Sequence, residues 1–585
     1  SSGTAEPGET AMFEITANDR RIEAEPGETI LSALTRAGIH VPTLCHMKKL
    51  TPTGACRICV VEVRGMPGLV PSCSTPVEAG MVISTNSPRV IEARKVIIEL
   101  LLADHPDDCL YCVRSGSCKL QKFAQDYGIR ERIFKPRRRE NTLDVTSPAI
   151  VFDQSKCILC GKCVRTCNEI QKVSAIEFTG RGSNMNVAPA FHDSLNISSC
   201  IYCGQCILAC PTGALREKSS LSEVTAALAD PGKTVVIQYA PAVSVSLAEE
   251  FGMKPGTDIS GFINAALRRL GFRWVFDTAY SADLMVMEEA AELASRLKAG
   301  MNLPMFTSCS PGWVKFVEEF YPEFIPNLSR CKSPQSMLGA LVKTYFAEKQ
   351  GLDPRRIFSV SAMPCTAKKF EAGRPEIGRG GMADLDAVLT TRELARLIRM
   401  SGIDFDQLEA EEADLPFGER STAGKLFGTS GGVMEAVLRT AHKLITGKEL
   451  KSLKIDQVRG MEGFKETKIR IGSLELGIAV ANGIGNVRAL LEQLKAGRRD
   501  LHFIEVMTCP GGCVAGGGQP INLLENDRIK ARMNSLYAID QSESLRTAHE
   551  NRDVQLLYKE YLKKPNSETA MRLLHTKYEK RNVPV

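Results

Sequence analysis

The chain has 585 residues, of which 43% are hydrophobic and 24% charged, and its formal net charge is +6. This length is too great for one hydrophobic core and predicts three to five domains. The small net charge gives no basis for a nucleic-acid partner. No run of about 18 apolar residues occurs, so no membrane span is expected. Residues 1–10 lack the features of a signal peptide and are interpreted as a tag or a disordered end.

Cysteine usage narrows the class of protein. Twenty cysteines occur, and nineteen of them fall into groups with short, regular spacing, while Cys331 is left over. Cysteines paired as C-x2-C in a chain without a secretion signal favour metal ligation over disulfides. We therefore expect a cytoplasmic metalloprotein.

Residues 11–88 are predicted to form a small β-grasp domain. Met12–Thr16 and Arg21–Ala24 alternate as the strands of a hairpin do, and Ile30–Ala37 is typical of a short helix ended by Gly38. The cysteines that follow have the spacing C-x10-C-x2-C-x13-C. Three thiolates on one loop and a fourth from farther along favour a plant-type [2Fe–2S] cluster, with a zinc site as the alternative. The predicted ligands are Cys45, Cys56, Cys59 and Cys73.

Residues 89–140 begin with an amphipathic helix, Val90–Leu102, and continue into the pattern H-x3-C-x2-C-x5-C. We predict a small helical domain with a [4Fe–4S] cluster held by one histidine and three cysteines, and a zinc site is the alternative. Because imidazole is neutral, it should raise the potential of the cluster. The basic run Lys135–Arg139 is interpreted as a solvated linker. The predicted ligands are His105, Cys109, Cys112 and Cys118.

Residues 141–221 carry the most specific motif of the chain. The run C-x2-C-x2-C-x3-C occurs twice, 43 residues apart, and is typical of ferredoxins with two [4Fe–4S] clusters. In such proteins the fourth cysteine of each run ligates the other cluster. One cluster is therefore assigned to Cys157, Cys160, Cys163 and Cys210, and the second to Cys200, Cys203, Cys206 and Cys167.

Residues 222–585 are predicted to form a large α/β domain, because short apolar runs alternate with helical stretches. The remaining grouped cysteines follow apolar runs, where open α/β sheets place their sites. The last pair lies in a glycine-rich loop, which lets the backbone approach a bulky inorganic group. The expected strands are Thr234–Gln238, Ile357–Val360, Ala387–Leu389 and Phe503–Val506, and the expected helices include Leu284–Leu297 and Thr391–Met400.

Three peptides in this domain resemble the signatures TSCCPxW, MPCxxKxxE and ExMxCxxGCxxGGGQP of the [FeFe]-hydrogenases. Here they read TSCSPGW (307–313), MPCTAKKFE (363–371) and EVMTCPGGCVAGGGQP (505–520). With the upstream cluster motifs, the whole of residues 11–585 resembles the large clostridial type of that family. The resemblance implies that residues 222–585 hold an H-cluster. This is a [4Fe–4S] cube joined to a di-iron unit with CO, cyanide and azadithiolate.

The resemblance also implies roles for individual residues. Cys365, Cys509 and Cys513 would ligate the cube, and Cys513 would bridge to the di-iron unit. Cys309 would pass protons to the azadithiolate amine. Other residues match the family's proton path, its cyanide contacts and its cavity walls. In that order they are Glu289, Glu292 and Ser329; Lys368, Ser333 and Pro334; and Met363, Met507, Gln335 and Phe427.

One position departs from the signature. Ser310 stands where the family has the fourth cysteine ligand of the cube, and a serine oxygen is a harder ligand than a thiolate. Three outcomes stay open: Ser310 ligates, the cube lacks a ligand or an iron, or Cys309 takes over as ligand. Cys331 is interpreted as a small buried side chain, with a stand-in ligand as the alternative.

The resulting hypothesis is a hydrogenase that catalyses 2H⁺ + 2e⁻ ⇌ H₂, with four accessory clusters as its electron relay. Ferredoxin or a similar low-potential carrier is the expected electron partner, and maturation proteins would supply the di-iron unit. Two alternatives remain. One is an electron-transfer or redox-sensing protein of the same fold with an altered H-cluster. The other is the catalytic subunit of an NAD(P)H-linked complex, although no nucleotide-binding motif is present in this chain.

Overall fold

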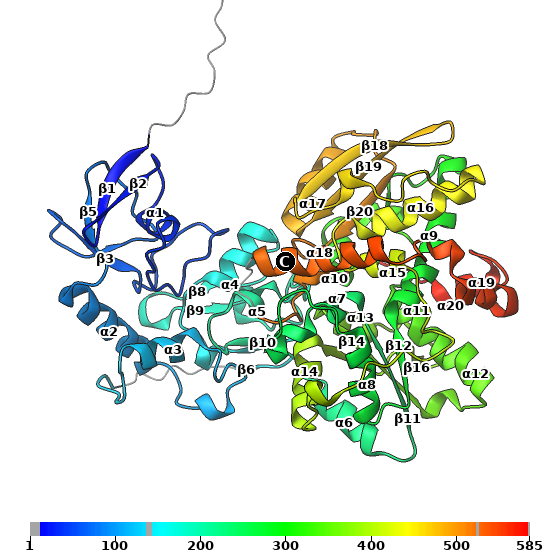
Figure 1. Ribbon diagram of the computed structural model, residues 1–585, viewed down its shortest axis with the longest axis horizontal. Helices are drawn as coiled ribbons and strands as arrows, with labels where there is room; N and C mark the ends of the chain where they lie inside the picture. The colour runs from blue at the N-terminus through cyan, green and yellow to red at the C-terminus, as the bar shows by residue number, and fades with distance from the viewer. Residues whose placement is uncertain (1–11, 136–142, 522–525, 583–585) are drawn as a thin grey trace, which may run out of the picture.

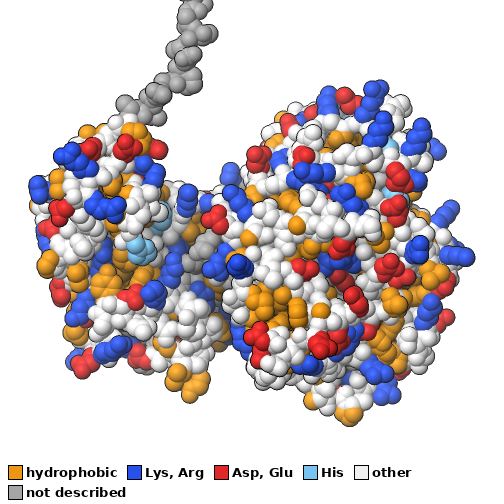
Figure 2. All heavy atoms as spheres, viewed as in Figure 1, with side chains coloured by type: hydrophobic (Ala, Val, Ile, Leu, Met, Phe, Trp, Pro, Cys, Tyr) orange, Lys and Arg blue, Asp and Glu red, His pale blue; other side chains and the backbone are white. Residues whose placement is uncertain are grey.

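The computed structural model describes residues 12–135, 143–521 and 526–582, which form a smaller and a larger lobe (Figure 1). The mixed α+β and α/β architecture agrees with the fold class predicted from the sequence. Acidic and basic side chains are interspersed over the face drawn in Figure 2. The predictions for residues 1–10 and for all but the first residue of the run Lys135–Arg139 lie outside the described residues.

The N-terminal domain is built on a mixed sheet with the strand order β2-β1-β5-β3-β4. β1 and β2 pair antiparallel, so the predicted hairpin is confirmed, and β1 also pairs in parallel with β5. Thr29 caps helix α1, which buries Ile30 and Leu34 in the core beneath the sheet. The elements are β1 (Phe13–Ala17), β2 (Arg20–Ala24), α1 (Ile30–Arg36), β3 (Val60–Val63), β4 (Val70–Pro71) and β5 (Val82–Ser84).

Helices α2 (Pro88–Ala103) and α3 (Lys119–Asp126) link this domain to the next. The predicted helix at 90–102 is confirmed, and it begins slightly earlier because Ser87 caps it and Pro88 occupies its first turn. Ile98 of α2 and Leu120 of α3 share one apolar core with Cys45 and Cys160. Three of the predicted cluster regions therefore pack on a common core.

The region with the repeated cysteine motif forms a compact unit around a three-stranded sheet, β10-β7-β6. Each motif starts a short helix immediately after a glycine with φ of 69°, Gly161 in the first motif and Gly204 in the second. The two helices pack against each other. The elements are β6 (Leu143–Asp144), β7 (Ile150–Asp153), α4 (Lys162–Arg165), β8 (Glu177–Thr179), β9 (Asn186–Ala188), α5 (Gln205–Ala209) and β10 (Leu215–Glu217).

The larger lobe contains two principal sheets. One is parallel with the order β12-β11-β14-β17, and the other has the order β13-β20-β19-β18, in which only β18 is antiparallel to its neighbour. The four predicted strands are confirmed as β11, β14, β17 and β20. The strands are β11 (Thr234–Tyr239), β12 (Trp274–Asp277), β13 (Met305–Phe306), β14 (Ile357–Met363), β17 (Ala387–Thr390), β18 (Phe464–Ile471), β19 (Leu474–Asn482) and β20 (Phe503–Met507), with a small hairpin of β15 (Gly378–Arg379) and β16 (Met382–Ala383).

Helix α9 (Thr278–Ala299) packs against α11 (Pro334–Leu341), α15 (Thr422–Leu426) and α16 (Gly432–Thr446) between these sheets. It was expected to begin at Leu284, but it begins six residues earlier because Asp277, at the end of β12, caps it through the N–H of Ala279. Helices α18–α20 run along the outside of the lobe, orange to red in Figure 1. The predicted helix at 391–400 is confirmed as α14.

The helices of the larger lobe other than α9 pack between or around the two sheets (Figure 1). They are α6 (Leu221–Ala229), α7 (Pro241–Ser244), α8 (Ser260–Arg269), α10 (Pro311–Phe320), α11 (Pro334–Leu341), α12 (Ala347–Gln350), α13 (Ala367–Ala372), α14 (Thr391–Met400), α15 (Thr422–Leu426), α16 (Gly432–Thr446), α17 (Ile484–Lys495), α18 (Asn526–Ser542), α19 (Arg552–Leu557) and α20 (Glu568–Leu574).

The glycine-rich loop joins the two lobes. A Cβ atom on Gly517 would lie 2.3 Å from the carbonyl oxygen of Cys203, so only glycine fits there without a shift of backbone. The Gln205 side chain donates to the Ala515 carbonyl at 2.9 Å, and Thr366 donates to the Tyr202 carbonyl at 2.7 Å. The cysteine motif of the smaller lobe is therefore held directly against the loop that carries Cys509 and Cys513.

Gly517→Ala should push these two backbones apart. We expect a loss of about 1–3 kcal/mol, as is typical of overpacking, measured as a lower thermal midpoint of the anaerobic protein. Gly373→Ala is the matched control, because the nearest atom to a Cβ there lies 3.7 Å away. Equal midpoints for the two variants would contradict the close approach of the lobes.

Candidate metal centres and active site

The four cysteines predicted to hold a [2Fe–2S] cluster are buried and lie together. The thiol of Cys45 is within hydrogen-bond reach of Cys56 and Cys73, and that of Cys59 is within reach of Cys73. The Cys45 N–H also donates to the Cys56 sulfur at 3.4 Å. A cluster of sulfurs with backbone N–H donors suits an iron–sulfur group.

The His105 side chain has the properties expected of a metal ligand. Its Nδ1 is buried and has no hydrogen-bond partner among the described residues. Burial lowers the pKa of His105 below its usual value, so the ring is neutral and its lone pair is available. Lys156, which forms an ion pair with Asp108 at 2.9 Å, lies beside both His105 and Cys112.

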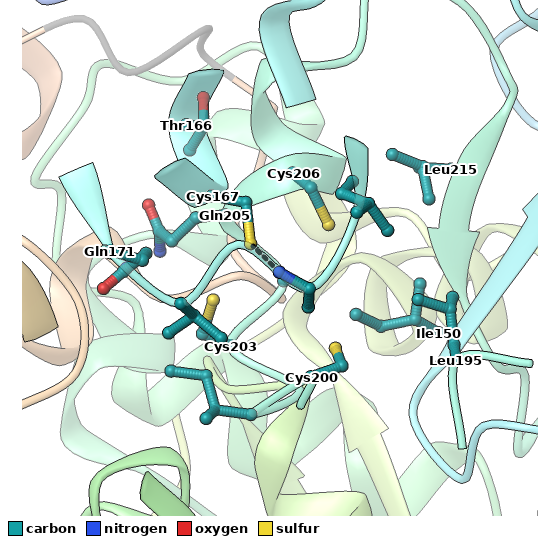
Figure 3. A pocket seen from close by; sticks show the side chains of 15 residues that line it. Ile150, Thr166, Cys167, Gln171, Leu195, Cys200, Cys203, Gln205, Cys206 and Leu215 are labelled. Carbon is teal, nitrogen blue, oxygen red and sulfur yellow. Dashed lines mark hydrogen bonds between the residues drawn. The ribbon is translucent and has the colours of Figure 1, made fainter. Parts of the chain in front are cut away.

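The two cysteine runs form two cavities, and each cavity is lined by three cysteines of one run and one cysteine of the other. One, of about 30 Å³, is lined by Cys200, Cys203, Cys206 and by Cys167 of the other run (Figure 3). Ala175 donates its N–H to the Cys167 sulfur at 3.3 Å, the dashed line in Figure 3. The other cavity, of about 10 Å³, is lined by Cys157, Cys160, Cys163 and Cys210. The structure therefore brings together the two crossed sets that the sequence predicted.

Three cysteines of the larger lobe lie just beyond the carboxyl ends of strands. Cys309 follows β13, Cys365 follows β14, and Cys509 follows β20. Since β13, β20 and β14 are parallel members of the two sheets, their carboxyl ends deliver these side chains to one region. A Cβ on Gly516 would lie 2.2 Å from the carbonyl oxygen of Pro364, so the loop of Cys513 is pressed against the segment of Cys365.

A cavity of about 60 Å³ opens between these segments. Its lining is mostly apolar, and the sulfurs of three cysteines and one lysine ammonium border it. Of the predicted wall and contact residues, Ser333 and Met507 are not among the residues that line the cavity, and the others are. The predicted residues that line the cavity are Cys309, Pro334, Gln335, Met363, Cys365, Lys368, Phe427 and Cys513.

Glu371 organises the polar side of this cavity. Its Oε2 accepts hydrogen bonds from Lys368 at 2.9 Å and from Ser333 and Gln335 at 2.7 Å each. Lys368 also donates to the carbonyl oxygen of Cys309 at 3.0 Å. These contacts fix the lysine ammonium at the cavity, although Glu371 was not singled out from the sequence. It could have been found there, because Glu371 is the last residue of the MPCTAKKFE peptide and matches the glutamate of the family signature.

Ser310 is the N-cap residue of α10, but its hydroxyl does not cap the helix. It is hydrogen-bonded to the Thr508 hydroxyl at 2.7 Å and accepts the Thr508 N–H at 3.2 Å. Thr508 directly precedes Cys509. The Ser310 oxygen is therefore held at the cysteine loop by a neighbour that the sequence did not indicate.

A line of buried polar groups leads from Cys309 along α9. Glu289 is fully buried, and neither of its carboxylate oxygens has a hydrogen-bond partner among the described residues. Burial, and then the charge of Glu292, raises the pKa of Glu289 to about 8. The nearby charge of Glu289 contributes to the raised pKa of the Cys309 thiol, after burial as the main cause.

Glu292 behaves in the opposite way. Burial disfavours its charge, but Arg296 and Arg330 outweigh this and hold its pKa below the usual value. Ser329 donates to its Oε2 at 3.1 Å, and Arg296 donates to its Oε1 at 2.7 Å. Glu292, Arg296 and Arg330 also line a surface cleft of about 470 Å³. A protonated carboxyl inside and an ionised one near the surface suit a proton relay.

Arg296 was missed from the sequence, although its spacing of four residues after Glu292 on one helix is a usual ion-pair signal. Cys331 is fully buried in the apolar core around α9, as interpreted from the sequence. Its sulfur also lies within 4.8 Å of ligand atoms of Glu292 and His575, two neighbours that the sequence did not indicate.

Family models match successive parts of the chain. The iron only hydrogenase large subunit, C-terminal domain, matches residues 233–517, and the iron hydrogenase small subunit matches 526–581. Upstream, a 2Fe-2S iron-sulfur cluster binding domain matches residues 10–88, the iron-sulfur binding region of NADH-ubiquinone oxidoreductase-G matches 94–132, and a 4Fe-4S dicluster domain matches 156–214.

Relatives align along nearly the whole chain. The NADP-reducing hydrogenase subunit HndD of Solidesulfovibrio fructosivorans is 46% identical over 98% of this chain and 99% of its own length. Iron hydrogenase 1 of Clostridium pasteurianum is 41% identical over 97% of this chain and 100% of its own. The chain belongs to the iron-only ([FeFe]) hydrogenase family. A solved variant of the [FeFe]-hydrogenase HydA1 from Chlamydomonas reinhardtii matches with 42% identity and a TM-score of 0.57, over 63% of this chain and 100% of its own.

This hydrogenase is therefore an oxidoreductase that acts on H₂, with [2Fe–2S] and [4Fe–4S] domains before its H-cluster domain. The family predicted from the three peptides is confirmed. None of its described helices is long and apolar enough to cross a membrane.

Replacing His105 by Cys tests the ligand assignment in this hydrogenase. A thiolate adds negative charge to the cluster, so its reduction potential should fall while total iron stays the same. Redox titration monitored by EPR, with iron analysis, measures both. His442→Cys is the control, because its ring lies in another region and bonds the Lys448 carbonyl. A site that loses its iron or contains zinc would contradict the assignment.

Glu289→Gln tests the buried carboxyl. The folded-state pKa of about 8 lies above the ordinary 4.5. As pH rises from about 4.5 to 8 the unfolded chain loses this proton while the folded chain keeps it, so the native state becomes less stable. Glutamine cannot ionise, so the denaturation midpoint of the variant should increase relative to that of the parent protein as pH rises through this range. The exposed Glu223, replaced by Gln, should show no such trend. A gain that does not depend on pH would show that Glu289 is already ionised.

Proposed function

We propose that this chain catalyses reversible proton reduction at an H-cluster held by Cys365, Cys509, Cys513 and Ser310. The observation that carries the proposal is the cavity where Cys309, Cys365, Cys513 and Lys368 meet at the strand ends. Sulfur ligands, a dry apolar wall and a glycine loop in close backbone contact fit such a group. When bound, the H-cluster supplies the iron site at which two protons and two electrons combine as H₂.

The accessory ligand sets are proposed as the sequence predicted them: one [2Fe–2S] cluster in residues 11–88, one [4Fe–4S] cluster in 89–140 and two in 141–221. Residues 222–585 are proposed as the H-cluster domain. Contacts between the sites support an electron-transfer route. Arg165 donates to the carbonyl oxygens of Cys45, at 2.6 Å, and Cys160, at 3.4 Å. A Cβ on Gly213 would lie 2.6 Å from the Cys112 sulfur. Both N-terminal sites therefore adjoin the cavity of Cys160.

From that cavity the route continues through the second ferredoxin-type site. The two crossed sets share a core, and the close contact between Gly517 and Cys203 brings the second set to the catalytic loop. Gln205 bridges the two parts through its bond to Ala515. These contacts support electron entry through either N-terminal site and one common exit to the H-cluster.

Protons would move along the residues of α9 and its neighbours. Cys309 faces the cavity, Glu289 holds a proton because of its raised pKa, and Ser329 hydrogen-bonds Glu292. Glu292 exchanges protons with water in the surface cleft. Lys368 and Glu371 form a fixed ion pair at 2.9 Å, so Lys368 acts in positioning rather than in proton transfer.

The electron partner is proposed to be ferredoxin or a similar low-potential carrier. The relative HndD is named as a subunit of an NADP-reducing hydrogenase, and its match over 98% of this chain favours a second candidate. In that case this chain is the catalytic subunit of an NAD(P)H-linked complex. Hydrogen evolution by the purified chain with reduced ferredoxin, compared with NADPH, separates the two.

Maturation proteins are proposed to supply the di-iron unit. All 20 cysteines are free of disulfides, which supports a reducing compartment such as the cytoplasm. Infrared spectroscopy of the matured, anaerobic protein tests the function directly. Bands of metal-bound CO and cyanide, together with hydrogen evolution, are the expected result. Intact accessory clusters without such bands would favour the electron-transfer or redox-sensing alternative.

Ser310→Cys tests the departure from the family signature. The Ser310 oxygen already lies beside the loop of Cys509, so a thiolate there is positioned to complete the four sulfur ligands. We expect hydrogen turnover per bound cluster to rise by about 10–100-fold, the effect typical of a metal site's supporting groups. Ser308→Cys is the control, because Ser308 instead donates to the Cys331 carbonyl. Unchanged turnover in the Ser310 variant would show that serine serves adequately.

A further inference from the structure

A second cluster of metal-ligand side chains lies apart from the iron–sulfur sites. Glu292, Cys331 and His575 each offer one ligand atom, and these atoms lie within 4.8 Å of one another. All three residues are buried, with exposed fractions of 1%, 0% and 7%. They come from α9, from the segment before α11 and from the residue after α20, and the last two form an isolated β-bridge. Sequence motifs did not connect them.

The histidine of this cluster is oriented as metal-binding histidines are. Its Nε2 is hydrogen-bonded to Glu288 at 2.8 Å, while its Nδ1 is buried and has no partner among the described residues. Glu288 is itself held by the Tyr558 hydroxyl at 2.6 Å and the Asn566 N–H at 2.8 Å. A carboxylate that receives one ring N–H leaves the other nitrogen as a free lone pair.

We propose that Glu292, Cys331 and His575 form a site for a borderline-soft divalent cation such as Zn²⁺, and that its occupation interrupts the proton route. One carboxylate, one thiolate and one neutral imidazole suit zinc. Bonds of about 2.0–2.3 Å place tetrahedral ligands some 3.3–3.8 Å apart, so any pair of ligand atoms near the 4.8 Å limit must approach by about an ångström. On binding, the Cys331 thiol releases one proton, and the cation then faces this thiolate and the Glu292 carboxylate, which is shared with Arg296 and Arg330.

Access to the site comes from the surface cleft of about 470 Å³. Glu292 and Thr576, the neighbour of His575, line that cleft, so water can take the fourth position on the metal. Glu292 now accepts hydrogen bonds from Ser329, from Arg296 and from the backbone and side chain of Arg330. A metal on this carboxylate competes with these donors and places a fixed positive charge on the route. The inhibitory effect rests on the proposed function, whereas the metal site does not.

The test uses the whole chain with its clusters loaded, washed free of extra metal and titrated with ZnCl₂ under anaerobic conditions. Zinc-edge X-ray absorption should show one bound zinc with one sulfur and several nitrogen or oxygen neighbours, and iron content should not change. Cys331→Ala should remove the sulfur neighbour. Glu288→Gln should weaken binding by about 10–100-fold, because it removes the partner that orients His575. His442→Gln is the control and should bind zinc as the parent does.

Hydrogen evolution is measured in the same titration, relative to each variant's own rate without zinc. The parent should be inhibited in parallel with occupation, and the Cys331 and Glu288 variants should require at least tenfold more zinc. MgCl₂ should have no effect. Zinc without a sulfur neighbour, or binding unchanged in both variants, would overturn the site. Binding with the sulfur neighbour but without inhibition would uphold the site and overturn Glu292 as a member of the proton route.

Discussion

The structure depends on one contact, the close approach of the glycine-rich loop to the cysteine motif of the smaller lobe. Gly517 lies against Cys203 of that motif, at a distance that admits no side chain. The neighbouring Gly516 lies equally close to Pro364 within the larger lobe. Buried amide groups close this contact, among them Gln171, whose side chain donates to the Thr508 carbonyl at 3.1 Å and accepts the Ile484 N–H at 3.0 Å. A buried amide group without a hydrogen-bond partner would destabilise the folded state, so these bonds hold the lobes in a single register.

That register brings the two sulfur-lined cavities of the repeated motif next to the one in the larger lobe, and apolar side chains pack around the cysteine groups. Core residues such as Ile98 and Phe123 lie between the two N-terminal sites, and Val164 and Ile207 lie beside the crossed pair. An apolar surround raises the cost of an isolated charge, and burial therefore raises the pKa of the Cys160 thiol to about 12. Binding of iron releases the thiol protons, so cluster loading and correct packing are expected to be coupled.

The sequence predicted the chemistry better than the supporting contacts. Fixed cysteine spacings identified the ligand groups, and apolar runs placed β11, β14, β17 and β20 to within a few residues, because both signals are local. The start of α9 was missed, since it depends on the cap by Asp277 at the end of a strand. Glu371 and Thr508 were missed because their roles arise from contacts between distant segments. Cys331 was correctly interpreted as buried, but its neighbours Glu292 and His575 could not be inferred from spacing.

The accessory sites and the H-cluster domain are proposed to form one electron-transfer unit. EPR of the oxidised, matured protein, frozen at short times after exposure to H₂, tests this most directly. Signals of reduced [4Fe–4S] clusters should appear within a turnover and should be absent in a Cys365→Ala variant that retains its accessory iron. Hydrogen uptake with the accessory clusters still oxidised would contradict it.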